Sequence, residues 1–445
     1  MKIGVPSEIK NNEHRVGLTP ESVKILSNLG HQLFIQSNAG NAIGFTDDLY
    51  KYSGGNIIDS ASEVFELSEL IVKVKEPVED EYKFLHKDLT LFTYLHLAGN
   101  PQQAKKLLDT GVTGIAYETV TAVDNSLPLL APMSAIAGQL SMVVGSYHLL
   151  KPNHGRGTLI SDIDPRIVTI IGAGVAGREA IAKAIANDAK VKVIDLDQSV
   201  LNELEKKYGQ QNIEYILSTP DSVHDAVCTS DLVIGSVYVV GKEAPKVVKK
   251  EMLQDMVNGS VLVDISIDQG GCFETSKPTN HDKPTFIYDG ILHYCVTNMP
   301  GAVPLTASNA LNKATLPFII ELAERGVNKA LDENIHLKNG LNIKHGEIIH
   351  RGKSADNAPT MIEAEQPVKP FPIDFLTMEG LLNKHEVNRE SDEVLNVMKQ
   401  DLREYSLTDN VDIYELPEGI KVRIKEAFLV LSITALSKET EGSFS

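Results

Sequence analysis

Residues 167–195 read IVTIIGAGVAGREAIAKAIANDAKVKVID, and this stretch decides the fold. The β-branched run over 167–171 predicts a strand, and the glycine-rich turn of residues 172–177 follows it directly. Apolar residues at 180, 181, 184 and 185 predict a helix, and residues 191–195 predict a second strand that ends in an aspartate. A strand, a GxGxxG turn, a helix and a second strand with a terminal acid form the dinucleotide-binding fingerprint.

Each residue type in this fingerprint has a physical reason. Gly172 permits the tight turn, Gly174 lets the backbone approach a pyrophosphate, and Gly177 lets the helix pack close to the strand. The N-terminus of the helix supplies free N–H groups and partial positive charge for the phosphates. Asp195 is placed to accept from both ribose hydroxyls and would repel a 2′-phosphate, for which Leu196 offers no cation. The sequence therefore predicts NAD rather than NADP.

Composition and charge exclude several classes of protein. The chain has 445 residues, 42% hydrophobic and 23% charged, which is typical of a globular protein with two or three domains. Its formal net charge of −18 argues against nucleic acid or an anionic membrane as the main partner. Cys228, Cys272 and Cys295 contain no CxxC pair, which predicts no disulfide framework, no zinc site and no other metal site, and suits a cytoplasmic protein. No apolar run reaches the ~20 residues that span a bilayer, and the first residues resemble a strand more than a signal peptide.

Strand and helix signals alternate over residues 1 to about 130 and again after the fingerprint, which favours parallel sheets covered by helices on both faces. Thr19 followed by Pro20 predicts a helix start. The other expected strands are residues 3–5, 33–35, 70–74, 89–95, 112–117, 232–234, 261–263, 286–287 and 292–296. Apolar residues three and four apart predict long helices over 134–150 and 306–324, and Pro317 should kink the second.

Because these two helices flank the fingerprint unit, we expect an inserted domain and a cleft between two lobes. The substrate-binding, catalytic domain would comprise residues 1–133 with 307–350, and the NAD-binding Rossmann domain residues 134–306. Residues 351–445 would form a C-terminal extension of unknown fold and role. Within it, prolines at 367, 370 and 372 predict an extended linker, Ser391 a helix cap, and the alternation of Ile420, Val422 and Ile424 a strand.

Polar residues follow three expected strands of the first domain. Arg15 is placed to bind a carboxylate, Lys75 to bind a carboxylate or polarise a carbonyl, and His96 to act as an acid or base near neutral pH. Each alone is equally or better explained as a solvated or structural residue. Three such residues at successive strand ends of one sheet are harder to dismiss, because ligands bind outside the carboxyl ends of parallel strands. Lys73 points the same way as Lys75 but further inside, which makes Lys75 the better candidate.

The nucleotide-binding unit offers two more polar candidates. Asp264 falls within an expected strand, and Asp268 at its carboxyl end is placed to handle a proton or a water. Asn298 ends a later strand and could bind the nicotinamide carboxamide or the substrate.

These motifs together closely resemble alanine dehydrogenases, within a wider group that includes the soluble part of proton-translocating transhydrogenase. The resemblance runs from residue 1 to about 350, and its motifs are MKIGVPSEIKNNEHRVGLTP, KVKEP, LFTYLHLAGN, AYETV, LPLLAPMSAIAGQLS, IGAGVAG, DISIDQGGCFE and TNMPGAVP. Transhydrogenase relatives lack the histidine at position 96 and the KVKEP motif in this form, so His96 and Lys75 favour alanine dehydrogenase.

The resemblance implies two Rossmann-like lobes joined by long helices, a homohexamer, and reversible deamination of L-alanine to pyruvate and ammonium with NAD. It implies that Arg15 and Lys75 bind the substrate and that His96 and Asp268 are the catalytic acid/base pair. The residues implied in cofactor binding are Ser134, Gly172, Gly174, Val175, Ala176, Gly177, Asp195, Ser218, Val237, Tyr238, Ile265, Ser266, Ile267, Asp268, Lys277, Val296, Thr297, Asn298 and Met299. Lys277 stands where the family usually has arginine, so a bidentate contact is lost there.

Three other hypotheses remain open. An NAD-binding transhydrogenase-type subunit would show no amino-acid-dependent NAD reduction, and a dehydrogenase of another amino acid would be separated by a substrate panel. A nucleotide-sensing scaffold that works through residues 351–445 would bind NAD without turnover.

Overall fold

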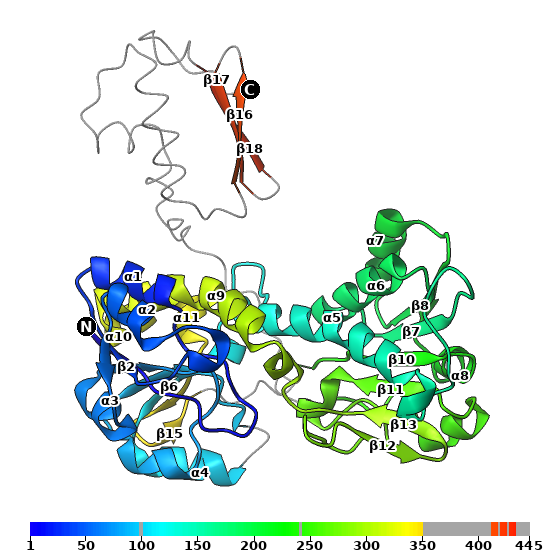
Figure 1. Ribbon diagram of the computed structural model, residues 1–445, viewed down its shortest axis with the longest axis horizontal. Coiled ribbons are helices and arrows are strands. Elements are labelled where there is room, and N and C mark those ends of the chain that lie inside the picture. The colour runs from blue at the N-terminus through cyan, green and yellow to red at the C-terminus, as the bar shows by residue number, and fades with distance from the viewer. Residues whose placement is uncertain (98–100, 240–242, 350–410, 417–418, 425–426, 433–445) are drawn as a thin grey trace, which may run out of the picture. The chain divides into compact units, whose positions relative to one another are not determined.

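The computed structural model describes residues 1–97, 101–239, 243–349, 411–416, 419–424 and 427–432 (Figure 1). The chain forms two compact units, Met1–Asn357 and Ala358–Ser445. The larger unit holds an eight-stranded and a seven-stranded sheet, and the smaller unit holds a three-stranded sheet.

The eight-stranded sheet has the order β15-β14-β6-β5-β4-β1-β2-β3. Its strands are β1 (Lys2–Val5), β2 (Gln32–Gln36), β3 (Asn56–Ile58), β4 (Leu70–Val72), β5 (Thr90–Thr93), β6 (Thr113–Ala116), β14 (Leu341–Lys344) and β15 (Glu347–Ile348). Strands β1 to β6 are parallel, and β14 joins the edge antiparallel to β6. The order reverses between β1 and β4, so the loops after these two strands meet where such sheets bind ligands.

Helices cover both faces of this sheet because its strands are apolar on both sides. Leu70 and Val72 belong to one buried cluster, and Ile71 between them belongs to another. The helices and 3-10 turns of this part are α1 (Pro20–Asn28), η1 (Asn41–Ile43), α2 (Asp47–Tyr52), α3 (Ala61–Leu67), η2 (Glu79–Phe84), α4 (Pro101–Thr110), η4 (Tyr117–Thr119), α9 (Pro304–Arg325), α10 (Val327–Glu333) and α11 (Ile335–Lys338). Thr19 caps α1 through its side chain, as predicted.

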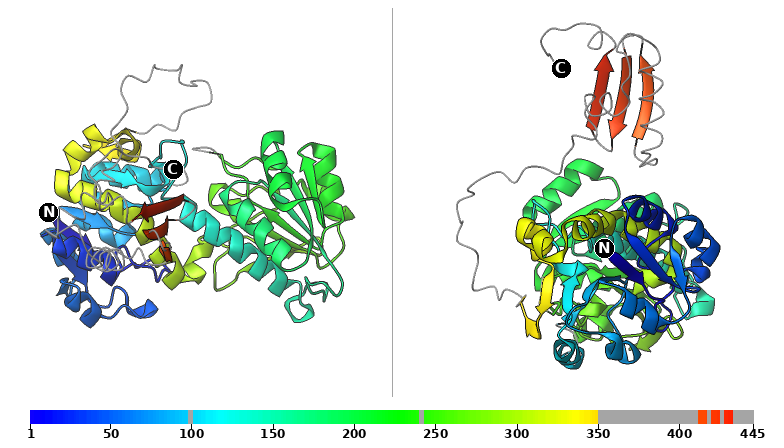
Figure 2. Two further views of the ribbon diagram at one scale, coloured as in Figure 1. Left: turned by 90° about the horizontal axis from the view of Figure 1, so that it is seen from above. Right: turned by 90° about the vertical axis from the view of Figure 1, so that its left-hand side faces the viewer.

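The seven-stranded sheet has the order β12-β13-β11-β10-β7-β8-β9, with only β12 antiparallel to its neighbour. Its strands are β7 (Ile167–Ile171), β8 (Lys190–Asp195), β9 (Ile213–Leu217), β10 (Leu232–Gly235), β11 (Val261–Asp264), β12 (Thr285–Tyr288) and β13 (Ile291–Tyr294). The helices and 3-10 turns are α5 (Ala131–His148), η5 (Lys151–Asn153), α6 (Val175–Ala186), α7 (Gln198–Tyr208), α8 (Pro220–Cys228), η6 (Lys250–Asp255), η7 (Ile265–Gln269) and η8 (Met299–Ala302). Helices lie on both faces of this sheet when it is seen from above (Figure 2, left). The predicted fold class is therefore confirmed.

The two long helices expected around the fingerprint unit are α5 and α9. Helix α5 contacts both α6 and α9, and Figure 1 shows α5 and α9 running between the two sheets. Helix α9 continues through Pro317. Within the described residues, no helix combines the length and the apolar character that crossing a membrane requires.

The smaller unit contains the antiparallel strands β16 (Val411–Leu416), β17 (Gly419–Ile424) and β18 (Ala427–Ser432). Strand β17 confirms the strand expected from Ile420, Val422 and Ile424. The predicted proline linker and the helix expected at Ser391 lie outside the described residues.

Two strands of the first sheet end earlier than their apolar runs predicted. Strand β4 ends at Val72, two residues before the expected Val74, and the N–H of Val74 donates instead to Glu8 Oε1 at 2.6 Å. Strand β5 ends at Thr93, and the next free N–H groups donate to Glu118. Carboxylates thus take the donors that a longer strand would have paired.

Candidate active site

Arg15, Lys75 and His96 follow β1, β4 and β5, three neighbouring parallel strands. All three residues therefore lie at the carboxyl edge of one sheet, as predicted. Glu118 follows β6, the next strand along, and extends the row. The sheet order thus places an arginine, a lysine, a histidine and a glutamate along one edge.

Arg15 is 2% exposed, and Glu13 forms two hydrogen bonds with one edge of its guanidinium. Its Nε donates to Glu13 Oε1 at 2.7 Å, and its Nη2 donates to Glu13 Oε2 at 2.5 Å. Burial alone would raise the pKa of Glu13, but the hydrogen bonds and charge of Arg15, with help from Asn298, lower it to about 2. Glu13 is therefore an ionised partner that balances the guanidinium.

The remaining nitrogen of the Arg15 guanidinium, Nη1, faces a weak acceptor. Its Nη1 donates to the thioether sulfur of Met133 at 3.2 Å, and sulfur accepts hydrogen bonds poorly. The edge formed by Nε and Nη2, which could make a bidentate contact with a carboxylate, is already occupied by Glu13. Nη1 is the position where a substrate carboxylate would improve the hydrogen bonding of Arg15.

Lys75 lies beyond the end of β4 and is 7% exposed. Among the described residues its ammonium has no hydrogen-bond or ion-pair partner. Burial lowers its pKa, the charge of Asp268 raises it, and the charge of Arg15 lowers it further. Lys75, Arg15 and Asp268 therefore lie within electrostatic range of one another, around a cation that lacks a direct partner.

Lys73 differs from Lys75 although both belong to the same segment. Its Nζ lies 2.6 Å from Glu81 Oε1 and 3.3 Å from Glu8 Oε2, and its side chain is fully buried. Burial would lower the pKa of Lys73, but these two carboxylates raise it. Lys73 is a structural ion-pair residue, which leaves Lys75 as the lysine available to a ligand.

His96 adopts a left-handed backbone conformation with φ 47°. Its N–H donates to Glu118 Oε1 at 2.6 Å, and its Nδ1 lies 4.0 Å from the same oxygen. The imidazole stacks on Tyr94 with ring centroids 5.6 Å apart, and the side chain is 40% exposed. Glu118 thus holds the backbone of His96, and the imidazole, stacked on Tyr94, remains accessible.

Asp268 and Asn298 come from the other sheet but lie further from strand ends than predicted. Asp268 is exposed in the 3-10 turn η7, four residues after β11 ends, and its charge reaches Lys75. Asn298 follows β13 by four residues and has φ 64°. Its Oδ1 accepts from Arg15 Nη2 at 2.5 Å, and its Nδ2 donates to Glu13 Oε2 at 2.9 Å. The Asn298 amide is thus hydrogen-bonded to both members of the Arg15–Glu13 ion pair.

Asp264 is the last residue of β11. It is fully buried and has a structural role. Its carboxylate accepts from the backbone N–H groups of Ser266, Cys272 and Phe273 and from the hydroxyl of Ser276. It therefore holds together the loop that carries Asp268.

The glycine turn after β7 has the geometry that a dinucleotide requires. Gly172 has φ 92°, and a Cβ on Gly177 would lie 1.9 Å from the Gly172 carbonyl oxygen, so neither position accepts a side chain. A Cβ on Gly174 would meet nothing within 4 Å, which leaves space beside the N-terminus of α6. Gly174 caps this helix without a side-chain hydrogen bond, so the first N–H groups stay available to an anion. These residues fit a pyrophosphate.

Asp195 ends β8 beside this turn. Its Oδ2 accepts from the N–H of Ala173 at 2.7 Å, and its Oδ1 accepts from the N–H of Asp197 at 2.9 Å. The carboxylate is fixed by backbone groups, and each oxygen keeps a lone pair for a ribose hydroxyl.

Most other candidate cofactor residues follow strands of the seven-stranded sheet. Ser218 follows β9, Val237 and Tyr238 follow β10, Ile265 to Asp268 form η7 after β11, and Val296 to Met299 follow β13. Their common position is the carboxyl edge of this sheet. Ser134 lies apart on α5, and Lys277 is exposed with its ammonium 6.0 Å from the centroid of the Phe286 ring.

Glu13 and Glu118 were not among the predicted site residues. Both follow strands of the eight-stranded sheet, and the rule that identified Lys75 and His96 would have identified them too. Their partners, Arg15 and the backbone of His96, can be seen only in the structure.

Comparisons with known proteins agree with this arrangement. Residues 4–137 match the N-terminal domain of the alanine dehydrogenase/PNT family, and residues 141–351 match its C-terminal domain. Alanine dehydrogenase from Halomonas elongata is 47% identical over 354 residues, which are 79% of this chain and 95% of the relative. The enzyme of that name from Mycolicibacterium smegmatis is 44% identical over 359 residues, 80% of this chain and 96% of the relative.

Solved structures extend the comparison to the fold. An L-alanine dehydrogenase structure has a TM-score of 0.75 and 44% identity, covering 79% of this chain and 97% of its own. A transhydrogenase from Sinorhizobium meliloti, at 22% identity and a TM-score of 0.66, shares the fold. Both family domains match in sequence, and together they cover residues 4–137 and 141–351. The chain therefore belongs to the alanine dehydrogenase/PNT family.

Proposed function

We propose that this protein is an NAD-dependent dehydrogenase that interconverts L-alanine with pyruvate and ammonium. The supporting observation is that Arg15, Lys75 and Asp268 lie within electrostatic range of one another, in a chain 44–47% identical to alanine dehydrogenases over about 95% of their length. Arg15 and Lys75 supply two cations that can bind the carboxylate of the substrate. Asp268 supplies a carboxylate that can transfer a proton.

Cofactor binding is assigned to the glycine turn and to Asp195. Gly174 and the N-terminus of α6 would hold the pyrophosphate, and Asp195 would accept from the ribose hydroxyls, which favours NAD over its 2′-phosphorylated form. When bound, NAD supplies the hydride acceptor for Cα of alanine.

The substrate carboxylate is assigned to Arg15 and Lys75. Arg15 Nη1 would exchange its weak sulfur acceptor for an anionic oxygen, and Lys75 would gain the partner that it lacks. With the carboxylate fixed at two points, Cα–H is held in one orientation, which lowers the entropic part of the barrier.

Proton transfer is assigned to His96 and Asp268. After hydride loss, a water adds to the substrate iminium, and the resulting carbinolamine collapses to pyruvate and ammonia. Water addition and collapse both move protons, and an accessible imidazole positioned by Glu118 can accept and return them. Asp268, exposed beside Lys75, would take the second proton position.

The remaining parts of the proposal concern organisation. We assign residues 1–133 with 307–350 to the substrate-binding domain and 134–306 to the NAD-binding domain, in agreement with how the strands divide between the two sheets. A homohexamer in the cytoplasm completes the proposal, and sedimentation of the purified chain tests the assembly.

A spectrophotometric assay tests the activity. NADH consumption by the full chain should require both pyruvate and ammonium, and NAD reduction should require L-alanine. A panel of amino acids and oxo acids tests the substrate, because equal turnover of a larger amino acid would identify a different dehydrogenase. NADH binding without amino-acid-dependent turnover would instead favour a transhydrogenase-type subunit or a nucleotide-sensing scaffold, and would reject the proposal.

A further inference from the structure

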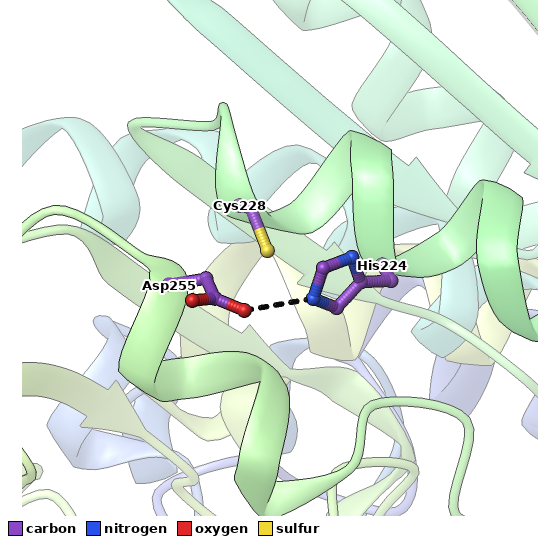
Figure 3. Close-up of side chains that lie close together, drawn as sticks. All are labelled: His224, Cys228 and Asp255. Atoms are coloured by element: carbon purple, nitrogen blue, oxygen red, sulfur yellow. Dashed lines mark hydrogen bonds and ion pairs between the residues drawn. The ribbon is translucent and has the colours of Figure 1, made fainter.

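Three side chains from helical elements that cover the seven-stranded sheet point toward one another. None of them is among the residues assigned to catalysis. His224 and Cys228 lie on α8, and Asp255 is the last residue of η6 (Figure 3). One ligand atom from each residue lies within 4.8 Å of the other two. The cluster combines a nitrogen, a sulfur and an oxygen donor.

The two helical elements hold these donors in place. His224 and Cys228 are four residues apart, so they share one face of α8. Val223 and Val227 of α8 pack in the same buried cluster as Met252 and Leu253 of η6. The side chains that carry the donors therefore project from two elements that are fixed to each other by an apolar core.

The three donor atoms lie near enough to one another for one metal ion to contact all of them after side-chain adjustment. His224 Nε2 lies 2.9 Å from Asp255 Oδ2. Donor atoms of a tetrahedral zinc site are separated by roughly 3.3–3.7 Å, from metal–ligand distances of about 2.0–2.3 Å. Side-chain rotations of exposed groups are sufficient to open the present contact to that value.

A fourth residue supports the histidine from the other side. His224 Nδ1 lies 3.6 Å from Asp225 Oδ1, opposite the nitrogen that faces Asp255. Metal-binding histidines usually donate their second ring N–H to a carboxylate, which fixes the tautomer and orients the ring. Asp225 lies near that position, at a separation slightly longer than a hydrogen bond.

Two carboxylates, those of Asp225 and Asp255, lie beside the imidazole of His224. They attract a divalent cation, which in turn stabilises the thiolate form of a cysteine that it binds.

We propose that His224, Cys228 and Asp255 form a binding site for a zinc-like divalent transition-metal ion, with a fourth position open to water. A borderline-soft ion fits a mixed nitrogen, sulfur and oxygen donor set better than magnesium or calcium does. On binding, the thiol proton of Cys228 passes to solvent, and the His224 ring binds as the neutral tautomer, with its proton on Nδ1 and the lone pair of Nε2 directed to the metal. The prediction of no metal site rested on the absence of a CxxC pair, whereas this site uses a His-x-x-x-Cys pair on a helix and a distant aspartate.

Metal titration of the full chain, first stripped with a chelator, tests the site. Calorimetric titration with Zn²⁺ is compared for wild type and for His224→Gln, Cys228→Ser and Asp255→Asn. His86→Gln and Asp221→Asn are matched controls, because both residues are exposed and lie outside the cluster. Each ligand variant should lose one equivalent of bound Zn²⁺ per chain, and the controls should retain it. Asp225→Asn should weaken binding about tenfold to 100-fold.

Cobalt spectroscopy provides a second readout that does not depend on activity. Co²⁺ in the wild-type site should show a thiolate-to-metal charge-transfer band that is absent in Cys228→Ser. Melting temperatures without metal should match between wild type and variants, which separates loss of binding from loss of folding. Equal Zn²⁺ stoichiometry and affinity in wild type and Cys228→Ser, or the same charge-transfer band in both, would overturn the proposal.

Discussion

Arg15 and Asn298 are joined by a hydrogen bond of 2.5 Å although 283 positions separate them in the sequence. Arg15 follows β1 of the eight-stranded sheet, and Asn298 follows β13 of the seven-stranded sheet. Glu13 accepts from both side chains and closes the network. The arginine that we propose binds the substrate is thus oriented by a residue that follows a strand of the other sheet.

Asn298→Ala removes this orienting contact. Hydrogen bonds to charged groups contribute about 1.5–3 kcal/mol, so kcat/KM for pyruvate should fall about tenfold to 100-fold. Steady-state kinetics at saturating NADH and ammonium measure the effect. Asn11→Ala is the control, because the exposed Asn11 amide donates to Asp282 at 3.2 Å and, within the described residues, makes no hydrogen bond with Arg15 or Glu13. An unchanged kcat/KM in Asn298→Ala would show that Arg15 does not need this contact.

Lys75→Met and Lys73→Met should separate function from stability. Lys75 is buried, and its ammonium has no direct partner among the residues that the structure describes, so its replacement should leave the melting temperature unchanged or raised while kcat/KM falls at least about 100-fold. Lys73→Met leaves Glu8 and Glu81 buried without their cation and should lower the free energy of unfolding by about 3–5 kcal/mol. Thermal and denaturant unfolding measure both variants. A large loss of stability in Lys75→Met would mean that the lysine is structural.

His96→Ala should lower kcat by about 100-fold or more, since general acid–base catalysis contributes that much. NADH affinity should be unchanged, because His96 belongs to the eight-stranded sheet and the glycine turn to the other. Fluorescence titration with NADH, run beside the kinetic assay, separates the two effects. Near-normal turnover in this variant would show that His96 is not the catalytic acid or base.

Gly174→Ala adds a methyl group in open space, whereas Gly177→Ala adds the same group against the backbone. At Gly174 the added Cβ meets no atom within 4 Å, so the melting temperature without cofactor should be unchanged while NADH affinity falls about tenfold or more. At Gly177 the Cβ would lie 1.9 Å from the Gly172 carbonyl oxygen, so stability itself should fall. Wild-type NADH affinity in Gly174→Ala would contradict the assignment of this turn to the pyrophosphate.

Glu13 should make stability depend on acidic pH. Its pKa is about 2 in the folded protein against an ordinary value of 4.5, so its stabilising contribution is complete above pH 4.5 and disappears as the pH falls toward 2. The difference in melting temperature between wild type and Glu13→Gln should therefore be largest at neutral pH and shrink over this window. Glu66→Gln, at an exposed position on α3, should show no such trend. A constant difference across the window would exclude Glu13 as the source.

The strand-end rule located Arg15, Lys75 and His96 from the sequence because local apolar patterning determines where each strand runs. The exact ends of β4 and β5 could not be predicted in the same way. Glu8 binds the N–H of Val74 from 66 positions away, and Glu118 binds the N–H of His96 from 22 positions away. Such side-chain-to-backbone bonds depend on the tertiary arrangement and leave no local pattern.

Partners of buried charges were the second kind of feature that the sequence did not show. Lys73 and Lys75 lie two residues apart in one segment, yet Glu8 and Glu81 neutralise only Lys73. The edge of Arg15 that seemed available to a substrate is likewise occupied by Glu13. Residue type and strand position predicted that a cation would be present, but not which of its donors remain unused.

The occupied edge of Arg15 has a consequence for ligand recognition. A guanidinium already clamped by Glu13 and Asn298 sits in one rotamer before any ligand arrives, so its conformational entropy has been lost during folding and not during binding. Such preorganisation favours the binding of small, rigid anions that accept a hydrogen bond from the one nitrogen left unused by Glu13 and Asn298. Binding of a bulkier acid is disfavoured where it requires the hydrogen bonds of Arg15 to Glu13 and Asn298 to break.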